Sequence, residues 1–242
     1  MPKIQDRHPI VVTGAAGALG AAVVCHLATR GHQVIAIDRP EAGDALSAVA
    51  REAPGVVPFE LDATSPETWS PVLERIATDF GPLGGAVLVA GGYRGGKRLF
   101  EPEADAHWRA MLEMNLESAR VALQMLLAPM VAAGHGSVVV IGSRAATRPW
   151  ESAGAAAYAA SKAAVVALVQ AVAAEVLDAG VRINAVLPST IDTAQNRRSM
   201  PNADASRWVS PASLCEVVTF LLSDGARDIS GALVPVYGRV GV

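Results

Sequence analysis

The chain has 242 residues, of which 51% are hydrophobic and 18% charged, and its net charge is −3 at pH 7. This composition supplies a sizeable core and excludes the basic surface of a nucleic-acid-binding protein. No basic start followed by a long apolar run marks a secretion signal, and the most apolar helical stretch, 163–177, is too short to cross a membrane. Cys25 and Cys215 lie in apolar helical patterns, which favours two buried hydrophobic side chains over redox or metal ligands. We therefore expect a cytoplasmic protein without a metal site or a membrane partner.

Short β-branched apolar runs alternate with helix-length segments along the whole chain. The runs that predict strands are 9–13, 33–38, 56–62, 85–92, 136–143, 181–188 and 232–238. The segments with helical periodicity run from the first strand to Gly31 and then over 41–52, 65–79, 103–133, 152–179 and 211–223. This alternation predicts an α/β fold of the Rossmann type, a doubly wound parallel sheet with helices on both faces. No linker divides the chain, so residues 1–242 are expected to form a single domain.

Two of the predicted helices, 103–133 and 152–179, are long and apolar around much of their circumference. A monomer would leave one side of such helices in water. We therefore expect a homo-oligomer, a dimer or a tetramer, assembled through these two helices.

The sequence TGAAGALG joins the first strand to the first helix. It places Gly14, Gly17 and Gly20, with Ala18 and Leu19 between them, where backbone must approach a pyrophosphate closely and a helix N-terminus must face it. The alternative is a tight turn without a ligand. The strand before and the helix after favour dinucleotide binding.

Asp38 ends the second strand, 24 residues after Gly14. A carboxylate at this place accepts hydrogen bonds from the adenosine ribose hydroxyls and repels a 2′-phosphate. The alternative is an Asp that merely ends a strand. The pattern favours NAD(H) as the cofactor. The neighbouring Arg39 softens the discrimination against a 2′-phosphate, so NADP(H) is the alternative.

The segment YAASK places Tyr158 and Lys162 four residues apart, on one face of a helix. An ammonium near a phenol favours phenolate, so Lys162 is expected to lower the pKa of Tyr158 and make it a general acid–base. Ser143 ends the strand 136–143, at the sheet edge where open α/β sheets carry their ligands. Asn115 is a polar residue within the apolar helix 103–133.

With these four residues in order, the sequence resembles the short-chain dehydrogenases/reductases over essentially its whole length. The resemblance implies that Tyr158 is the catalytic acid–base and that Lys162 binds the nicotinamide ribose. It also implies that Ser143 orients the substrate carbonyl and that Asn115 holds a water behind the lysine. Further cofactor contacts are implied at Asp62, Ala63, Ala90, Gly91, Pro188, Ile191 and Thr193.

The implied activity is an NAD(P)(H)-dependent oxidoreductase that transfers hydride between nicotinamide and a small-molecule carbonyl or secondary alcohol. Three departures from the common pattern argue against a standard 3-oxoacyl-carrier-protein reductase: the spacing TGxxGxxG, the sequence LVAG at 88–91, and Ser189 after Pro188. A module that binds NAD without turnover is a further alternative.

The polar segment NRRSMPNADASRW, residues 196–208, follows Thr193 and interrupts the apolar pattern. With the glycine-rich stretch around Tyr93, it resembles the dihydropteridine reductases, so we expect a substrate lid over about 190–210 rather than a spacer. Tyr93 either stacks on a flat substrate or packs on the lid. Arg197 and Met200 are candidate substrate contacts, although loop arginines are more often solvated or ion-paired.

The alternative activity is therefore an NADH-dependent quinonoid dihydropteridine reductase. The pterin enzymes that the lid resembles lack the orienting serine and the relay asparagine, which this chain has as Ser143 and Asn115. Their presence favours reduction of an ordinary carbonyl.

Overall fold

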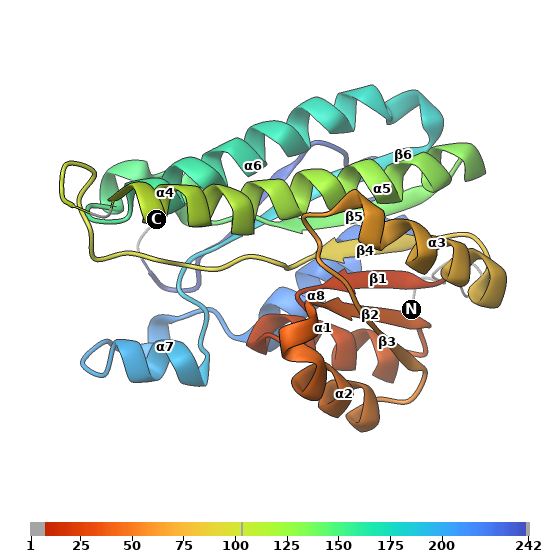
Figure 1. The fold of residues 1–242 in the computed structure, drawn as a ribbon, viewed down its shortest axis with the longest axis horizontal. Helices are drawn as coiled ribbons and strands as arrows, with labels where there is room; N and C mark the ends of the chain where they lie inside the picture. The colour runs from red at the N-terminus through yellow and green to blue at the C-terminus, as the bar shows by residue number, and fades with distance from the viewer. Residues whose placement is uncertain (1–7, 103, 241–242) are drawn as a thin grey trace.

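The computed structural model describes residues 8–102 and 104–240, and within them the chain forms a seven-stranded, all-parallel sheet (Figure 1). The strand order is β3-β2-β1-β4-β5-β6-β7. The strands are β1 Ile10–Thr13, β2 Val34–Asp38, β3 Val56–Glu60, β4 Gly85–Leu88, β5 Gly136–Ile141, β6 Val181–Pro188 and β7 Leu233–Val236. This confirms the predicted Rossmann-type α/β fold. The order reverses at β1, between β2 and β4, and such a switch point opens a crevice at the carboxyl ends of the strands.

Helices cover both faces of the sheet (Figure 1). They are α1 Ala18–Thr29, α2 Gly43–Glu52, α3 Pro66–Phe80, α4 Ala104–Met111, α5 Ser118–Ala133, α6 Ala156–Glu175, α7 Ala194–Ser199 and α8 Pro211–Leu222. Helices α3, α5 and α6 cover one face, and α1, α2 and α8 cover the other. The short helix α7 stands apart from the sheet.

Side chains that alternate along each central strand fill the two cores. In β1, Val11 packs with the α3, α5 and α6 side, while Ile10 and Val12 pack with the α1, α2 and α8 side. All three are at most 3% exposed. Burial on both faces explains why the strands have continuous apolar sequences rather than alternating ones.

The long predicted helix 103–133 is interrupted. Residue 103 lies outside the described part of the chain, and α4 and α5 are joined by a π-helical segment, Leu112–Glu117. The predicted helix 152–179 is shorter as α6: residues 152–155 are not helical, and a 3-10 turn, Leu177–Ala179, takes up its C-terminal end. Extra residues inserted in a helix ladder often mark a functional site. Here the inserted segment carries Asn115.

Two helical segments, Ala104–Ala133 and Ala156–Glu175, are long and apolar enough to cross a membrane by length and composition alone. We expected the apolar stretch 163–177 to be too short to cross a membrane. That expectation was wrong about length, because the helix that contains most of it, α6, has 20 residues. Both segments nevertheless bury one side against the sheet in the larger core. Core helices that pack on a sheet also have this length and composition, so we interpret both segments as core helices and not as membrane spans. Both cysteines are free, and burial raises the pKa of the Cys215 thiol to about 11.

The predicted lid segment is a compact excursion whose two ends meet. Ile191 forms a parallel bridge with Val209, and Asp192 N–H donates to the Val209 carbonyl at 2.8 Å. Between these ends the chain forms α7 and a 3-10 turn, Ala205–Arg207. The segment is thus ordered by its own contacts, and its role as a substrate lid stays a prediction.

Candidate active site

One long cleft runs across the carboxyl ends of the strands, from the end of β2 to α7. The predicted site residues that line it, from the predicted cofactor end to the lid, are Gly14, Gly17, Ala18, Leu19, Gly20, Asp38, Arg39, Asp62, Ala63, Ala90, Gly91, Tyr93, Ser143, Tyr158, Lys162, Pro188, Ile191, Thr193 and Met200. Asn115 lies directly behind the cleft and is 1% exposed. The fold therefore brings together residues that are far apart in the sequence.

The glycine turn is packed too tightly for side chains. Gly14 has φ +66°, and a Cβ there would lie 2.7 Å from the Ala90 nitrogen. A Cβ on Gly20 would overlap the Gly14 carbonyl oxygen. Gly17 caps α1 without a side-chain hydrogen bond, so the first N–H groups of that helix are left for an anion. These features fit the pyrophosphate of a dinucleotide.

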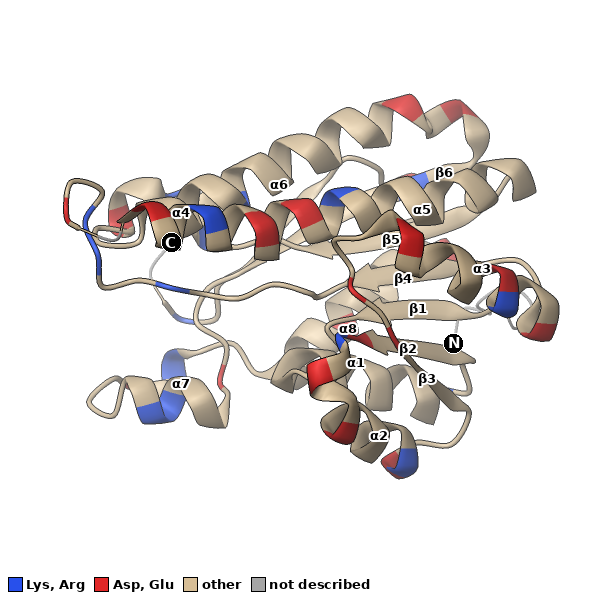
Figure 2. Ribbon diagram, viewed as in Figure 1, with Lys and Arg blue, Asp and Glu red and all other residues tan. Residues whose placement is uncertain are grey.

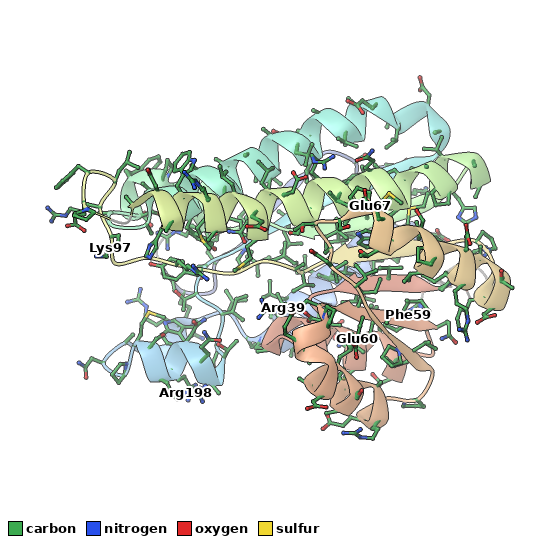
Figure 3. The ribbon with its side chains drawn as sticks, viewed as in Figure 1. Arg39, Phe59, Glu60, Glu67, Lys97 and Arg198 are labelled. Atoms are coloured by element: carbon green, nitrogen blue, oxygen red, sulfur yellow. The ribbon has the colours of Figure 1, made fainter. Side chains whose placement is uncertain are left out.

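Asp38 lies at the end of β2 and braces the same turn. One carboxylate oxygen accepts from Ala16 N–H at 2.8 Å, and the other accepts from Arg39 N–H at 2.9 Å. Each oxygen keeps a lone pair for a ribose hydroxyl. Figure 3 shows Arg39 beside this end of the cleft.

The loop after β3 forms the next wall of the cleft. Asp62 Oδ1 accepts from Thr64 N–H at 2.9 Å, and the indole N–H of the fully buried Trp69 donates to the Ala63 carbonyl at 3.3 Å. These contacts fix the backbone at Asp62 and Ala63, two positions that the family resemblance assigns to cofactor contacts. The turn, Asp38 and this loop together fit an adenine dinucleotide.

Ser143 and Tyr158 come from the end of β5 and the first turn of α6. Ser143 is 7% exposed and accepts from Ala145 N–H at 3.1 Å, so the hydroxyl is fixed at the start of a 3-10 turn. It lies near enough to the Tyr158 hydroxyl to lower the pKa of that phenol. Tyr93 meets Tyr158 edge to face, with ring centroids 5.0 Å apart. These three side chains surround the place where a substrate carbonyl would lie.

The pKa of Tyr158 differs from the sequence-based expectation. Burial raises this pKa, the nearby Ser143 hydroxyl opposes the rise, and Tyr93 adds to it. The prediction that Lys162 lowers the pKa was therefore wrong for this structure, because the ammonium points elsewhere and donates to the Ile141 carbonyl at 2.9 Å. A phenol with a raised pKa stays protonated at neutral pH and is ready to donate.

Asn115 connects the loop after β4 to the catalytic helix. Its Oδ1 accepts from Gly92 N–H at 2.9 Å, and its Nδ2 donates to Ser161 Oγ at 3.0 Å. The Ser161 hydroxyl donates in turn to the Tyr158 carbonyl at 2.8 Å. The structure therefore gives Asn115 a direct bracing role, while the water behind Lys162 stays a prediction.

Burial lowers the pKa of Lys162, which is 6% exposed, from 10.5 to about 8. Between these values the unfolded chain binds a proton that the folded chain has lost, so this lysine makes the free energy of unfolding rise with pH. We expect a rise on the order of 3 kcal/mol between pH 8 and 10.5. Urea titrations of the parent and Lys162→Met across this range measure it. The variant should lack the rise; equal pH slopes would contradict the burial argument.

The segment Pro188–Thr193, which carries three of the implied cofactor contacts, lines the cleft after β6 with all of its residues except Asp192. Ser189 Oγ donates to the Tyr237 carbonyl at 2.8 Å, so the residue that replaces the family's glycine ties β6 to the chain after β7. Thr193 Oγ1 caps α7 by accepting from Asn196 N–H at 3.2 Å. That bond uses one lone pair and leaves the hydroxyl proton for a ligand.

The lid contributes some of its predicted residues to the cleft but not all. Met200 lines the cleft together with Gln195, Asn196 and Ser199. Arg197 instead forms a two-pronged ion pair with Asp192, at 2.6 and 2.8 Å, and does not line the cleft. Tyr93 is 66% exposed and packs on Tyr158 rather than on the lid.

Sequence reasoning missed the wall that follows Ser143. Arg144, Arg148 and Glu151 line the cleft, and so does Val240 from the end of the described chain. The Arg144 guanidinium donates to the Val240 carbonyl at 3.1 Å. The sequence GSRAATRPW shows the charges, but no spacing rule shows that Val240 returns to the site.

Comparison with known proteins agrees with this geometry. Residues 8–204 match the short-chain dehydrogenase family profile, and the chain belongs to the short-chain dehydrogenase/reductase family. The cis-4-hydroxycyclohexanecarboxylate dehydrogenase of Sinomonas cyclohexanicum is 31% identical, with 94% of each chain covered. The 3-oxoacyl-[acyl-carrier-protein] reductase of Escherichia coli is also 31% identical, with 94% of this chain and 95% of that one covered.

Solved structures give the same result. A short-chain dehydrogenase/reductase from Mycobacterium ulcerans superposes with a TM-score of 0.87 at 26% identity, covering 98% of this chain and 90% of that one. A candidate NAD(P)-dependent gluconate 5-dehydrogenase from Beutenbergia cavernae, with NADP bound at low occupancy, superposes with a TM-score of 0.85 at 28% identity, covering 98% of both chains. The chain is thus an NAD(P)-dependent oxidoreductase of this family, and the resemblance of its lid to dihydropteridine reductases stays a prediction.

Proposed function

We propose that the protein interconverts a ketone and a secondary alcohol of a small molecule, with NAD(H) as its preferred cofactor and Tyr158 as the acid–base. The observation that carries the proposal is that Ser143 and Tyr158 lie together at the wall of a cleft whose other half fits a dinucleotide. A pterin substrate has no comparable support, because the orienting serine fits a carbonyl oxygen.

Each catalytic residue has a distinct task in this reaction. The bound nicotinamide supplies or accepts the hydride at the carbonyl carbon. Ser143 holds the substrate oxygen by a hydrogen bond, and Tyr158 donates the proton to it during reduction. Lys162, on the same face of α6, lines the cleft beside them, where the family resemblance gives it the nicotinamide ribose to bind. Asn115 fixes α6 to the loop at Gly92, so that these groups keep their relative positions.

The preference for NAD(H) rests on Asp38. Its carboxylate lies in the cleft, and a 2′-phosphate placed against it would be repelled. Arg39, which lines the same part of the cleft, would attract that phosphate. We give the carboxylate more weight because backbone N–H groups hold it in place, whereas the Arg39 side chain is exposed.

The test is an initial-rate comparison with NADH and NADPH over cyclic ketones, open-chain ketones, 3-oxoacyl thioesters and freshly generated quinonoid dihydropterin. We expect turnover of at least one ketone, faster with NADH and slowed at least about 100-fold by Tyr158→Phe. A dihydropterin rate far above all ketone rates would replace the proposal with the pterin activity. Cofactor binding without turnover of any of these substrates would support the binding module.

We also propose that α5 and α6 form an interface between copies of the chain. We propose as well that the protein works in a reducing, cytoplasmic compartment. Exposed alanines on the two helices, Ala128, Ala167, Ala171 and Ala174, allow close approach of helices from another copy. The free cysteines fit the compartment. Light scattering should give the mass of a dimer or tetramer. A monomer at micromolar concentration would contradict the proposed interface.

A further inference from the structure

The wall of the cleft beyond Ser143 carries more positive than negative charge. Arg94, Arg144 and Arg148 line this half of the cleft, against Glu113 and Glu151. Figure 2 shows that basic residues also occur on the loop after β4 and on α7, the two segments that border the opening. Arg198, on the side of α7 turned away from α4 in Figure 3, does not line the cleft. The positive charge inside the cleft therefore comes from the wall after Ser143 and from Arg94.

Arg144 is held in place by contacts within the protein. Its guanidinium pairs with Glu151 at 2.5 Å, donates to the Val240 carbonyl and lies 5.5 Å above the centre of the Tyr237 ring. The side chain is 14% exposed, and its buried Nε has no hydrogen-bond partner among the described residues. Arg144 therefore orients Glu151 and has little freedom to bind anything else.

Arg148 differs from Arg144 because most of its donors are free. Its guanidinium has one polar contact among the described residues, to Glu151 at 3.5 Å, which is too long for a strong hydrogen bond. The side chain is 28% exposed and lines the cleft. Its backbone is fixed, since Arg148 N–H donates to the Arg144 carbonyl at 2.9 Å. A planar fork of donors thus faces the cleft on the segment that also positions Ser143.

We propose that Arg148 is a specificity-determining residue that binds a carboxylate on the substrate, away from the reacting carbon. This rests on the proposed function, because it places a second anchor beside the ketone site. The planar guanidinium matches a carboxylate through two parallel N–H···O bonds. Glu151 already balances one of the two arginines, so a substrate carboxylate balances the other.

The test measures binding without turnover, so that its failure is separate from failure of the proposed reaction. Calorimetry on the NADH-loaded protein compares cyclohexanecarboxylate with its methyl ester, which has the same ring and no charge. We expect the carboxylate to bind at least about tenfold more tightly, as loss of a charge-assisted pair predicts. Arg148→Gln should remove this preference while keeping affinity for NADH, and Arg148→Lys should restore part of it.

Arg227→Gln is the matched control, because Arg227 is exposed and does not line the cleft. It should leave the preference for the carboxylate unchanged. Equal affinity of the parent for acid and ester, no measurable binding of the acid, or a preference that survives Arg148→Gln would each overturn the proposal. The ketone activity and its dependence on Tyr158 are measured separately and would stand in all three cases.

Discussion

Tyr158→Phe is expected to lower kcat by at least about 100-fold, the scale of a lost general acid–base. The ring and its edge-to-face contact with Tyr93 remain in this variant, and only the hydroxyl beside Ser143 is removed. Affinity for NADH, followed by fluorescence titration, should stay within about threefold, since the lost hydroxyl lies on the carbonyl side of the site. Initial rates with the best ketone of the panel measure the loss.

Tyr237→Phe is the matched control. It removes a phenol whose hydroxyl lies 3.1 Å from Thr147 Oγ1 and which does not line the cleft. We expect less than about a threefold change in kcat, the size of a modest neutral hydrogen bond. If Tyr158→Phe kept the parent rate, Tyr158 would not be the proton donor and the proposed chemistry would be wrong.

Asp38→Asn is expected to shift cofactor preference from NADH toward NADPH by about ten- to a hundredfold in kcat/KM, because a charge-assisted hydrogen bond is weakened and the repulsion of a 2′-phosphate disappears. Asparagine keeps an acceptor for Ala16 N–H, so the glycine turn that Asp38 braces stays in place. Kinetics with both cofactors at fixed substrate measure the shift.

Asp44→Asn serves as the charge control for this variant. Asp44 is an exposed residue in the first turn of α2 and does not line the cleft, so the same change of net charge there should leave the preference unchanged. A preference that does not respond to Asp38→Asn would remove Asp38 from the explanation of cofactor choice.

Local sequence pattern predicts most of this fold because strands that are buried on both faces have recognisable apolar runs in the sequence. The strands β1, β2, β4, β5 and β6 are mostly apolar and mostly buried, and the turn glycines stand where no Cβ fits. The residues of the cofactor half are predictable for the same reason, since backbone geometry dictates their types. Helix ends were less predictable: the π-helical segment around Asn115 has no distinct periodicity in the sequence.

The substrate half depends on contacts that the sequence pattern does not identify. Val240 returns beside Arg144 from far along the chain. Even the short-range contacts, the Asp192–Arg197 ion pair and the Thr193 cap of α7, occur in a segment without a helical or strand pattern. The pKa of Tyr158 follows the same rule, because its burial depends on how α6, β5 and the loop carrying Tyr93 close together.

The most direct test of the central claim is transfer of deuterium from C4-deuterated NADH, prepared separately with the label on each face of the ring, to the ketone that gives the highest rate. Mass spectrometry of the product alcohol measures incorporation. The proposed reaction predicts one deuterium at the carbinol carbon from one of the two labelled forms, incorporated at least about 100-fold more slowly with Tyr158→Phe. Oxidation of NADH without deuterium in the product from either form would contradict the assignment of this protein as a carbonyl-reducing, hydride-transferring enzyme.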